Sequence, residues 1–308
     1  MLLITTISGS LCVVCVCAIL AKVVPDLRAS VLTYGKLSET ADAPRSKWVS
    51  RLAACTVPKS YFAHFYLGGL VFGLYCGIEL ALLKSQRTER SLGPLLDFLR
   101  RWDSSRGSHR VEGWKCLVGL GLMTCHLARR LLECWLVERP SPSARMHLSH
   151  YILGFGFYGA MVFGTWLEGV GDLSLWGQDK WQRQPTTGYP ILSTVLGIGL
   201  FLYVSLHQYR CHSILAALRS NKKNEDGQRY RVPYGDWFEY LVTPHYTCDV
   251  LVYVSLCILY QGQSIIMLCG LLWTLVNLSV VASETKEWYI ATFPDFPKKR
   301  WIMVPGLY

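Results

Sequence analysis

The chain alternates between long apolar stretches and shorter segments that are rich in charge. A helix needs about 20 mainly apolar residues to cross the hydrocarbon of a bilayer. Seven stretches approach or exceed this length and are expected to form helices: residues 2–21, 61–83, 116–137, 150–170, 190–206, 237–260 and 264–282. Because most charges lie between these stretches, the pattern predicts an all-α integral membrane protein with about seven transmembrane helices.

The amino-terminal region is expected to form a unit of its own. Its apolar stretch is uncharged over the whole length and ends at Lys22, without the small-residue cleavage site of a signal peptide. We therefore expect this stretch to be retained as a helix. Together with a basic linker it makes up residues 1–56, and residues 57–308 are expected to form the main membrane domain.

Composition supports a membrane protein. Of the 308 residues, 51% are hydrophobic and 17% are charged, whereas soluble domains carry about 25% charged residues. Lys and Arg number 31 against 21 Asp and Glu, which gives a net charge of +10. The basic residues lie beside the apolar stretches and no nucleic-acid-binding motif is present. They are therefore expected to flank the membrane and to contact phosphate groups.

A cluster of ionisable side chains lies within the third apolar stretch. Its members are His126, Arg129, Arg130 and Glu133, whose spacing places all four on one face of a helix. Arg129 and Glu133 can pair because they are four residues apart. Ionisable groups within a span are costly unless they pair or line a wet cavity. The cluster is therefore either a self-neutralised structural feature or a site for an anion or a substrate.

The helical pattern of the fifth stretch continues into polar sequence. Gln208, His212 and Arg219 lie on one stripe of this continuation. Amide, imidazole and guanidinium groups are the ones that bind phosphates and nucleotide edges. His207 and His212 are five residues apart, a spacing that does not point two ligands at one ion, so no metal site is expected.

Polar residues also gather near the start of the sixth stretch and after the seventh. Arg231 lies in a Pro/Gly turn, and His245 and Asp249 are four residues apart and face one way. Asp249 needs a partner within a span, and a ribose hydroxyl or a carboxamide would serve. The alternative is a belt of interfacial aromatic residues with charges that reach the membrane surface. Lys286 and Tyr289 precede a proline-rich tail that is expected to fold back against the same membrane face.

Several of these runs resemble one known family. The steroid 5-alpha-reductase family is closely matched by HQYRCHSILAALR (207–219), VPYGDWFEY (232–240) and EWYIATFPDFPKKR (287–300). The first two runs, with VPKSYFAHFY (57–66), look like the polyprenol (polyprenal) reductase branch of that family. The resemblance covers most of residues 57–308, the steroid 5-alpha-reductase-like membrane domain.

The resemblance implies a multi-pass enzyme of the endoplasmic reticulum membrane, with about seven helices and a cytosol-facing cofactor pocket. Such an enzyme uses NADPH to saturate a carbon–carbon double bond conjugated to a carbonyl group. In the polyprenal branch the substrate is a long-chain polyisoprenoid, polyprenal (polyprenol). Reduction of its alpha-isoprene double bond gives dolichal (dolichol) for protein N-glycosylation. The resemblance implies neither nucleic acid nor a metal ion as a partner.

The resemblance also implies which residues contact the cofactor. The family's cofactor-contacting positions fall on Gln208, His212, Arg219, Arg231, His245, Asp249 and Tyr289. Just before Tyr289, where relatives carry His, this chain has Thr285, Lys286 and Glu287. Lys286 is expected to hold a phosphate there.

The chemistry of the reaction indicates what else the site must supply. Hydride adds to a carbon only if the remaining negative charge is delocalised, and the carbonyl oxygen of an enal or enone accepts that charge. The protein must therefore supply a hydrogen-bond donor for this oxygen and a proton for the alpha carbon. The steroid branch uses a Glu on helix two and a Tyr on helix three, but Leu127 occupies the latter position here. Helix two offers Tyr61, His64 and Tyr66. We expect Tyr61 or His64 to be the donor, with His126 as a further candidate.

Two other functions are open at this point. A 3-oxo-steroid 5-alpha-reductase of the same family would be expected to carry the Tyr on helix three, which is missing. A non-catalytic seven-helix receptor or transporter is the alternative from another class. A transporter would be expected to show internal repeats, and the sequence shows none.

Overall fold

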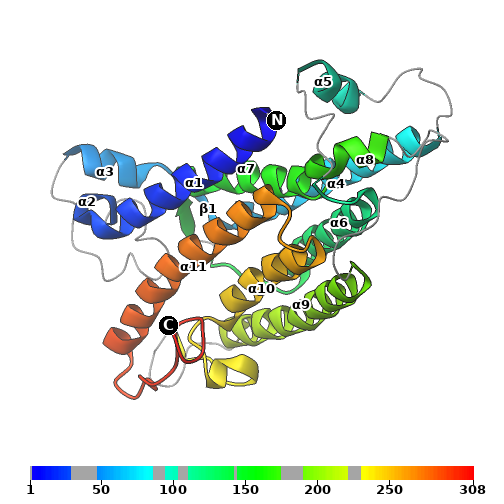
Figure 1. Cartoon of the computed structure of the whole chain (residues 1–308). Coiled ribbons are helices and arrows are strands. Elements are labelled where there is room, and N and C mark those ends of the chain that lie inside the picture. Colours follow the sequence, from blue (N-terminus) through cyan, green and yellow to red (C-terminus); the bar gives the residue numbers. More distant parts are fainter. Residues whose placement is uncertain are drawn as a thin grey trace.

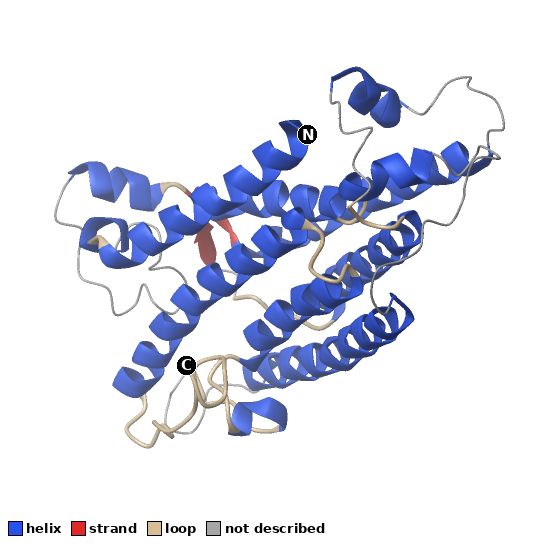
Figure 2. Ribbon diagram, viewed as in Figure 1, coloured by secondary structure: helices blue, strands red, loops and turns tan. Residues whose placement is uncertain are grey.

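The computed structural model describes residues 2–28, 47–85, 94–102, 110–141, 144–174, 190–220 and 230–308. Most of this part of the chain is helical (Figures 1 and 2). The α-helices are α1 (Leu2–Val23), α2 (Pro25–Leu27), α3 (Lys47–Ala54), α4 (Phe62–Ser85), α5 (Pro94–Trp102), α6 (Gly113–Leu136), α7 (Leu148–Gly164), α8 (Val170–Ser174), α9 (Pro190–Ser220), α10 (Pro244–Leu259) and α11 (Ile265–Thr292). Short 3-10 helices occur at η3 (Lys59–Tyr61), η5 (Leu167–Gly169) and η6 (Asp236–Glu239), and two strands at β1 (Thr56–Pro58) and β2 (Arg145–His147).

Each of the seven apolar stretches contains one long helix, in chain order α1, α4, α6, α7, α9, α10 and α11. Four segments are long and apolar enough to cross a membrane: Leu2–Val23, Lys59–Leu82, Ile191–Arg219 and Ile265–Thr292. The helix Pro244–Leu259 is apolar but shorter. Length and composition therefore support four spans within the described residues, and the predicted number of seven is not confirmed.

The start of the sixth helix differs from the prediction. The apolar stretch begins at Trp237, but α10 begins at Pro244, whose missing N–H suits the first turn of a helix. The preceding residues form η6, after a turn in which φ is 92° at Gly235 and 47° at Asp236. The Glu239 carboxylate closes this turn by accepting a hydrogen bond of 2.6 Å from the Gly235 N–H. The aromatic residues of η6 continue the apolar composition, so hydropathy alone does not reveal the break.

A short antiparallel ribbon departs from the expected all-α pattern. β1 pairs with β2 in the register Thr56↔His147 and ties the segment before α4 to the segment before α7. Strands of three residues are too short to show a periodicity in sequence. Residues 29–46, the middle of the predicted basic linker, lie outside the described part of the chain.

The long helices pack in neighbouring pairs. α9 lies along α10, α4 packs against both α6 and α7, and α11 packs against α1, α10 and α7 (Figure 1). The approach of α9 to α10 requires a glycine, because a Cβ at Gly197 would lie 2.8 Å from the carbonyl oxygen of Ser255.

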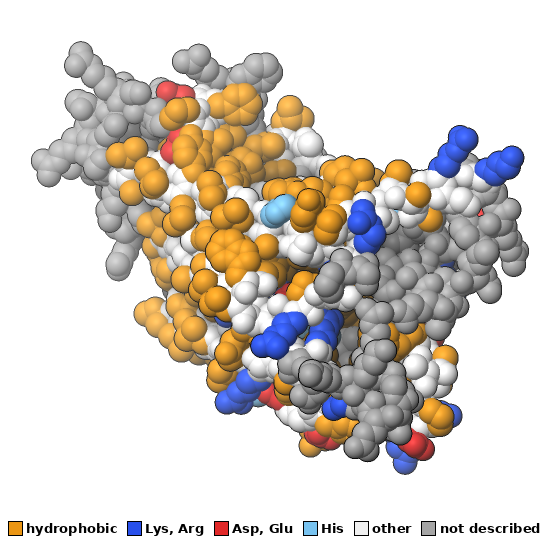
Figure 3. Space-filling model, turned by 180° about the vertical axis from the view of Figure 1, so that it is seen from behind, with side chains coloured by type: hydrophobic (Ala, Val, Ile, Leu, Met, Phe, Trp, Pro, Cys, Tyr) orange, Lys and Arg blue, Asp and Glu red, His pale blue; other side chains and the backbone are white. Residues whose placement is uncertain are grey.

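The outer faces of these helices are apolar. Val16 on α1, Val71 and Ile78 on α4, and Val195 on α9 are each more than half exposed. Apolar side chains cover a broad part of the surface seen from behind, whereas Lys and Arg side chains gather toward its lower and right-hand parts (Figure 3). Such large exposed apolar areas are typical of helices that face lipid.

The carboxy-terminal tail folds back, as the sequence predicts. Leu241 and Trp301 form an isolated bridge between the tail and the segment ahead of α10. The Arg300 guanidinium donates a hydrogen bond of 2.9 Å to the carbonyl oxygen of Pro233. The tail therefore lies against the turn that carries Arg231.

A group of four charged side chains joins the end of α1 to α11. Arg28 donates hydrogen bonds of 2.7 Å to both Glu284 and Glu287. Lys22 also pairs with Glu284 and lies 3.4 Å from Glu287. The hydrogen bond to Glu284 is the main reason why the pKa of Arg28 is raised above its usual value. These contacts fix the amino-terminal helix against the last one.

Removal of the Glu284 charge is expected to loosen this connection. Glu284→Gln keeps the size of the side chain but leaves Lys22 and Arg28 with only the more exposed carboxylate of Glu287. We expect a loss of roughly 1–3 kcal/mol, between the values for exposed and buried ion pairs. The measurement is the midpoint of thermal unfolding of the purified protein in nanodiscs. Glu287→Gln is the matched control and should lower the midpoint clearly less. Equal shifts of the midpoint in the two variants would show that Glu284 is not the main partner of Lys22 and Arg28.

Candidate functional site

A cavity of about 300 Å³ lies among α4, α6, α7, α9, α10 and α11. This volume is at the lower end of the range of small-molecule sites. Its charged lining residues are Lys59, Arg130, Glu138, Arg139, Arg219 and Asp249. Its large aromatic lining residues include Phe65, Tyr66, Phe157, Tyr158, Tyr253 and Trp273. The cavity therefore combines groups that bind anions with a broad apolar wall.

Helical spacing on α9 and α10 aims their polar residues at the cavity. α9 has 31 residues, which exceeds the roughly 20 needed to cross the hydrocarbon, so its last turns continue beyond the apolar part. His212 and Arg219, both on the polar part, line the cavity from one stripe of this helix. His245 and Asp249 line it from α10, one turn apart. The two stripes that the sequence predicts thus face the same space.

One carboxylate on α6 organises the polar wall. Glu133 is 2% exposed and pairs with the guanidinium groups of both Arg129 and Arg130. His212 reaches the same carboxylate from α9, with its Nδ1 2.6 Å from the Glu133 Oε2 and 2.7 Å from the Arg130 Nη1. Because Nδ1 carries at most one proton, it either donates to the carboxylate or accepts from the guanidinium. Glu133 therefore joins α6 to α9.

A buried amide joins the same two helices to α10. Gln208 is fully buried, and its side-chain oxygen accepts a hydrogen bond from Arg129. Its Nε2 donates to the Asp249 carboxylate and, at 3.3 Å, to the backbone oxygen of His245. Gln208 thus lies behind the cavity and fixes the position of Asp249, which does line it.

Glu138 follows the end of α6 and adds a second carboxylate to this wall. Arg130 donates a hydrogen bond of 2.9 Å to it. Burial disfavours the charged form, but the neighbouring Arg130 and His212 outweigh it and hold the pKa of Glu138 below its usual value. Glu138 therefore stays ionised at neutral pH and balances part of the positive charge of the lining.

The structure brings together only part of the predicted cofactor-binding set. His212, Arg219, His245 and Asp249 line the cavity, and Gln208 supports them from behind. The other three lie outside the cavity lining: Arg231 in the turn before η6, Lys286 and Tyr289 on α11.

Two of those three have clear partners in the tail. Lys286 donates a hydrogen bond of 2.9 Å to the carbonyl oxygen of Arg300. The Tyr289 ring stacks on Phe296 with centroids 5.1 Å apart. Cofactor contacts for Arg231, Lys286 and Tyr289 stay predictions.

The predicted catalytic residues also lie outside the cavity lining. Tyr61 is 38% exposed and packs against His64, with ring centroids 4.5 Å apart. The His64 Nδ1 lies 3.1 Å from the hydroxyl of Tyr151. His126 is buried, and its Nδ1 lies 3.2 Å from an Arg129 nitrogen. Their roles as donors stay predictions.

Several lining residues do not belong to the predicted set. Lys59, Tyr66 and Glu138 are examples, and Tyr253 is another. Tyr253 could have been found by spacing, since it is four residues beyond Asp249 and continues the same stripe of α10. Which face of α4 points inward depends on packing against α6 and α7, so the sequence does not single out Tyr66.

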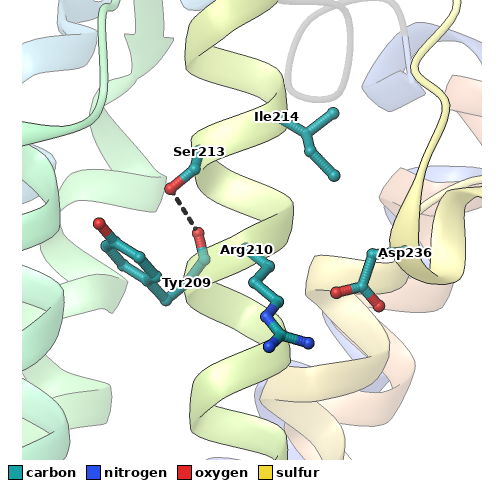
Figure 4. A pocket seen from close by; sticks show the side chains of 5 residues that line it. All are labelled: Tyr209, Arg210, Ser213, Ile214 and Asp236. Atoms are coloured by element: carbon teal, nitrogen blue, oxygen red, sulfur yellow. Dashed lines mark hydrogen bonds between the residues drawn. The ribbon is translucent and has the colours of Figure 1, made fainter.

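A second pocket lies on the outer face of α9 (Figure 4). Tyr209, Arg210 and Ser213 border it from α9, and Asp236 faces them from η6. Successive residues of a helix are turned by about 100° from one another. The α9 residues that border this pocket therefore lie on a different face of the helix from the stripe that contains His212. This pocket is more open than the cavity among the helices, and Arg210 is the one cation among the described residues that line it, so the cavity among the helices is the candidate site.

Histidines on α9 do not converge on a common point. The His207 Nδ1 lies 2.7 Å from Asp236, whereas His212 faces Glu133 on α6. Within the described ranges, no group of three or more His, Cys, Asp or Glu side chains could hold a metal ion.

Comparisons with known proteins converge on one family. A family model described as 3-oxo-5-alpha-steroid 4-dehydrogenase matches residues 157–308, which include α9, α10 and α11. The polyprenal reductase of Xenopus tropicalis is 31% identical over 298 residues, covering 94% of this chain and 90% of the relative. The polyprenal reductase of Homo sapiens is 30% identical over 271 residues, covering 84% and 81%. Polyprenal reductase 1 of Oryza sativa subsp. indica is 29% identical over 312 residues, covering 91% and 87%.

Loss of the Glu133 charge is expected to destabilise the whole polar wall. Glu133→Gln leaves the buried Arg130 and the partly exposed Arg129 without their common counter-charge, and breaking a buried ion pair costs about 3–5 kcal/mol. The expected result is a large fall in the midpoint of thermal unfolding and in the yield of folded monomer in detergent. Asp295→Asn, which removes an exposed carboxylate in the tail, is the control and should leave both unchanged. A Glu133 variant as stable as this control would show that the carboxylate does not organise the site.

Proposed function

Because the chain belongs to the steroid 5-alpha-reductase family, whose enzymes are oxidoreductases that act on carbon–carbon double bonds, we propose that it reduces polyprenal. The reaction saturates the alpha-isoprene double bond with NADPH and gives dolichal, which feeds dolichol synthesis for protein N-glycosylation. Relatives named polyprenal reductase that match over most of their length support this substrate class.

The observation that carries the proposal is the mixed lining of the enclosed cavity. Four cationic residues, Lys59, Arg130, Arg139 and Arg219, line it together with two acidic ones, Glu138 and Asp249. An excess of positive charge suits a ligand that bears phosphates. The aromatic residues of the same cavity suit an isoprenoid chain, which has no polar groups beyond its head. The chemistry of this lining suits the phosphates of a nucleotide cofactor and the apolar chain of a lipid substrate.

NADPH fits the donor set of the polar wall. Arg219 and Lys59 would bind its phosphates, and His212 would add a hydrogen bond. Asp249, held in place by Gln208, would accept hydrogen bonds from a hydroxyl or a carboxamide. When bound, NADPH supplies the hydride. The chain's own residues orient the ligand and shield it from bulk water.

The aldehyde suits the chemistry better than the alcohol. Saturation of a double bond by hydride leaves negative charge on the substrate, and the conjugated aldehyde oxygen delocalises it. Polyprenol has no such acceptor. The protein therefore needs a neutral donor at the aldehyde oxygen, and hydroxyl groups among the cavity's aromatic residues can serve.

The membrane arrangement follows from the substrate. A long polyisoprenoid stays in the bilayer, so a site among helices can receive it from the side. We propose that α6, α7 and α10 cross the endoplasmic reticulum membrane together with the four long apolar segments. The polar end of α9 and the tail, both rich in basic residues, would then face the cytosol.

A substrate comparison tests the proposed function. Purified protein in nanodiscs receives NADPH and, separately, polyprenal, polyprenol or a 3-oxo-4-ene steroid, and products are followed by mass. We expect polyprenal to gain two hydrogens while polyprenol stays unchanged. Turnover of the steroid alone would support the steroid reductase instead. Absence of turnover with all three would favour a non-catalytic protein.

Arg219 is expected to contribute to cofactor affinity. Arg219→Ala removes a guanidinium from the cavity and should raise the KM for NADPH about tenfold, the loss of one charge-assisted hydrogen bond. The KM for NADH should rise less if Arg219 contacts the 2′-phosphate. Arg210→Ala is the matched control, since Arg210 borders the outer pocket (Figure 4) and lies nine residues before Arg219, about half a turn around the same helix. Equal KM values in the two variants would remove Arg219 from the cofactor site.

A further inference from the structure

Tyr253 carries a buried hydroxyl that has no hydrogen-bond partner among the described residues. The residue lies on α10, is 2% exposed and lines the enclosed cavity. Buried tyrosine hydroxyls usually have a partner, because an unsatisfied one lowers the stability of the fold. An orphaned donor that lines a cavity indicates a ligand group in that cavity.

Neighbouring tyrosines show that the fold satisfies buried phenols elsewhere. Tyr260, just beyond the end of the same helix, is fully buried and donates a hydrogen bond of 2.8 Å to the carbonyl oxygen of Thr165. Tyr66, across the cavity, has its hydroxyl 3.3 Å from an Arg130 nitrogen. Tyr253 differs from both because its hydroxyl makes no hydrogen bond within the described part of the chain, while its side chain lines the cavity.

Tyr253 continues the polar stripe of α10 that lines the cavity. His245, Asp249 and Tyr253 follow one another at four-residue intervals on α10, so Tyr253 lies about two turns further along the helix than His245. The Phe157 ring meets it edge-on, with centroids 5.5 Å apart. The polar residues proposed to contact the cofactor thus lie toward the start of α10 from Tyr253, and Phe157 of α7 packs beside its ring.

We propose that Tyr253 is a catalytic residue whose hydroxyl donates a hydrogen bond to the aldehyde oxygen of the substrate. This inference rests on the proposed function. Hydride and its electron pair form the new C–H bond at the beta carbon, and the pair from the double bond moves into the enolate. The alpha carbon then takes one proton from water. Tyr253 keeps its own proton throughout.

The surroundings favour a hydrogen bond over proton transfer. Asp249 lies one turn before Tyr253 on the same face of α10. A second negative charge beside this carboxylate is unfavourable, so the phenol remains neutral and acts as a donor. In a cavity with little water, one such donor stabilises a developing oxyanion more strongly than it would in bulk water.

Kinetics of Tyr253→Phe test the role. The variant keeps the ring and loses only the hydroxyl, so the KM for NADPH should stay the same. We expect kcat with polyprenal to fall about 100-fold, the typical effect of removing one oxyanion donor. Tyr209→Phe is the control, because Tyr209 is 45% exposed and borders the outer pocket of α9. Its kcat should equal that of the wild type.

A spectroscopic readout without cofactor tests the same contact. The probe is citral, a short isoprenoid enal, labelled with carbon-13 at the carbonyl and bound to the protein in the absence of NADPH. A hydrogen bond to the aldehyde oxygen lowers its infrared stretching frequency. We expect this lowering in the wild type and in Tyr209→Phe, and its loss in Tyr253→Phe.

The outcomes separate the inference from the function on which it rests. Wild-type turnover with an unchanged kcat in Tyr253→Phe, or an unchanged carbonyl frequency, would overturn the role of Tyr253 and leave the proposed function intact. If the wild type binds citral and lowers its carbonyl stretching frequency but reduces no enal, the proposed reaction is overturned. The hydrogen bond from Tyr253 would still be supported. Wild type that neither binds nor reduces an enal would overturn both.

Discussion

Two adjacent arginines within a helical bundle need counter-charges, and the Glu133 carboxylate is the one that they share. Arg129 and Arg130 follow one another on α6, where a guanidinium without a partner would be too costly to keep. Glu133 lies one turn later and pairs with both. Because His212 on α9 contacts the same carboxylate at 2.6 Å, the group that pairs with the arginines of α6 also fixes the orientation of α9. The other polar contacts of the site extend from this point.

The side-chain amide of Gln208 connects this network to α10. Gln208 accepts from Arg129 and donates to Asp249, so α10 is fixed by the network that begins at Glu133. α6, α9 and α10 therefore hold the polar wall through charged and hydrogen-bonded groups. α4, α7 and α11 supply most of the large aromatic residues of the lining, and these contacts are less directional. Such a division would hold a polar ligand in one orientation while the apolar wall accepts chains of different length.

Sequence predicts what is local and misses what depends on how helices face one another. His212 lines the cavity together with Arg219, and His245 together with Asp249, because helical spacing places the members of each pair on one face. Helical spacing does not determine which face of a whole helix points toward the cavity, because that depends on packing against helices that are distant in the sequence. Tyr61 and Tyr66 are five residues apart, yet only Tyr66 lines the cavity. The start of α10 was missed for another reason, since aromatic residues continue the apolar composition through η6.

Tyr253 connects the energetics of the fold with its chemistry. A phenol buried without a partner costs stability, and Phe at this position would fill the same space at no such cost. A purely structural role therefore gives no reason for the hydroxyl, whereas a ligand with an acceptor oxygen does. The cavity around it is lined by residues suited to phosphates and residues suited to an isoprenoid chain. An aldehyde head between those two regions would bring its oxygen to the side chain that the fold leaves unsatisfied.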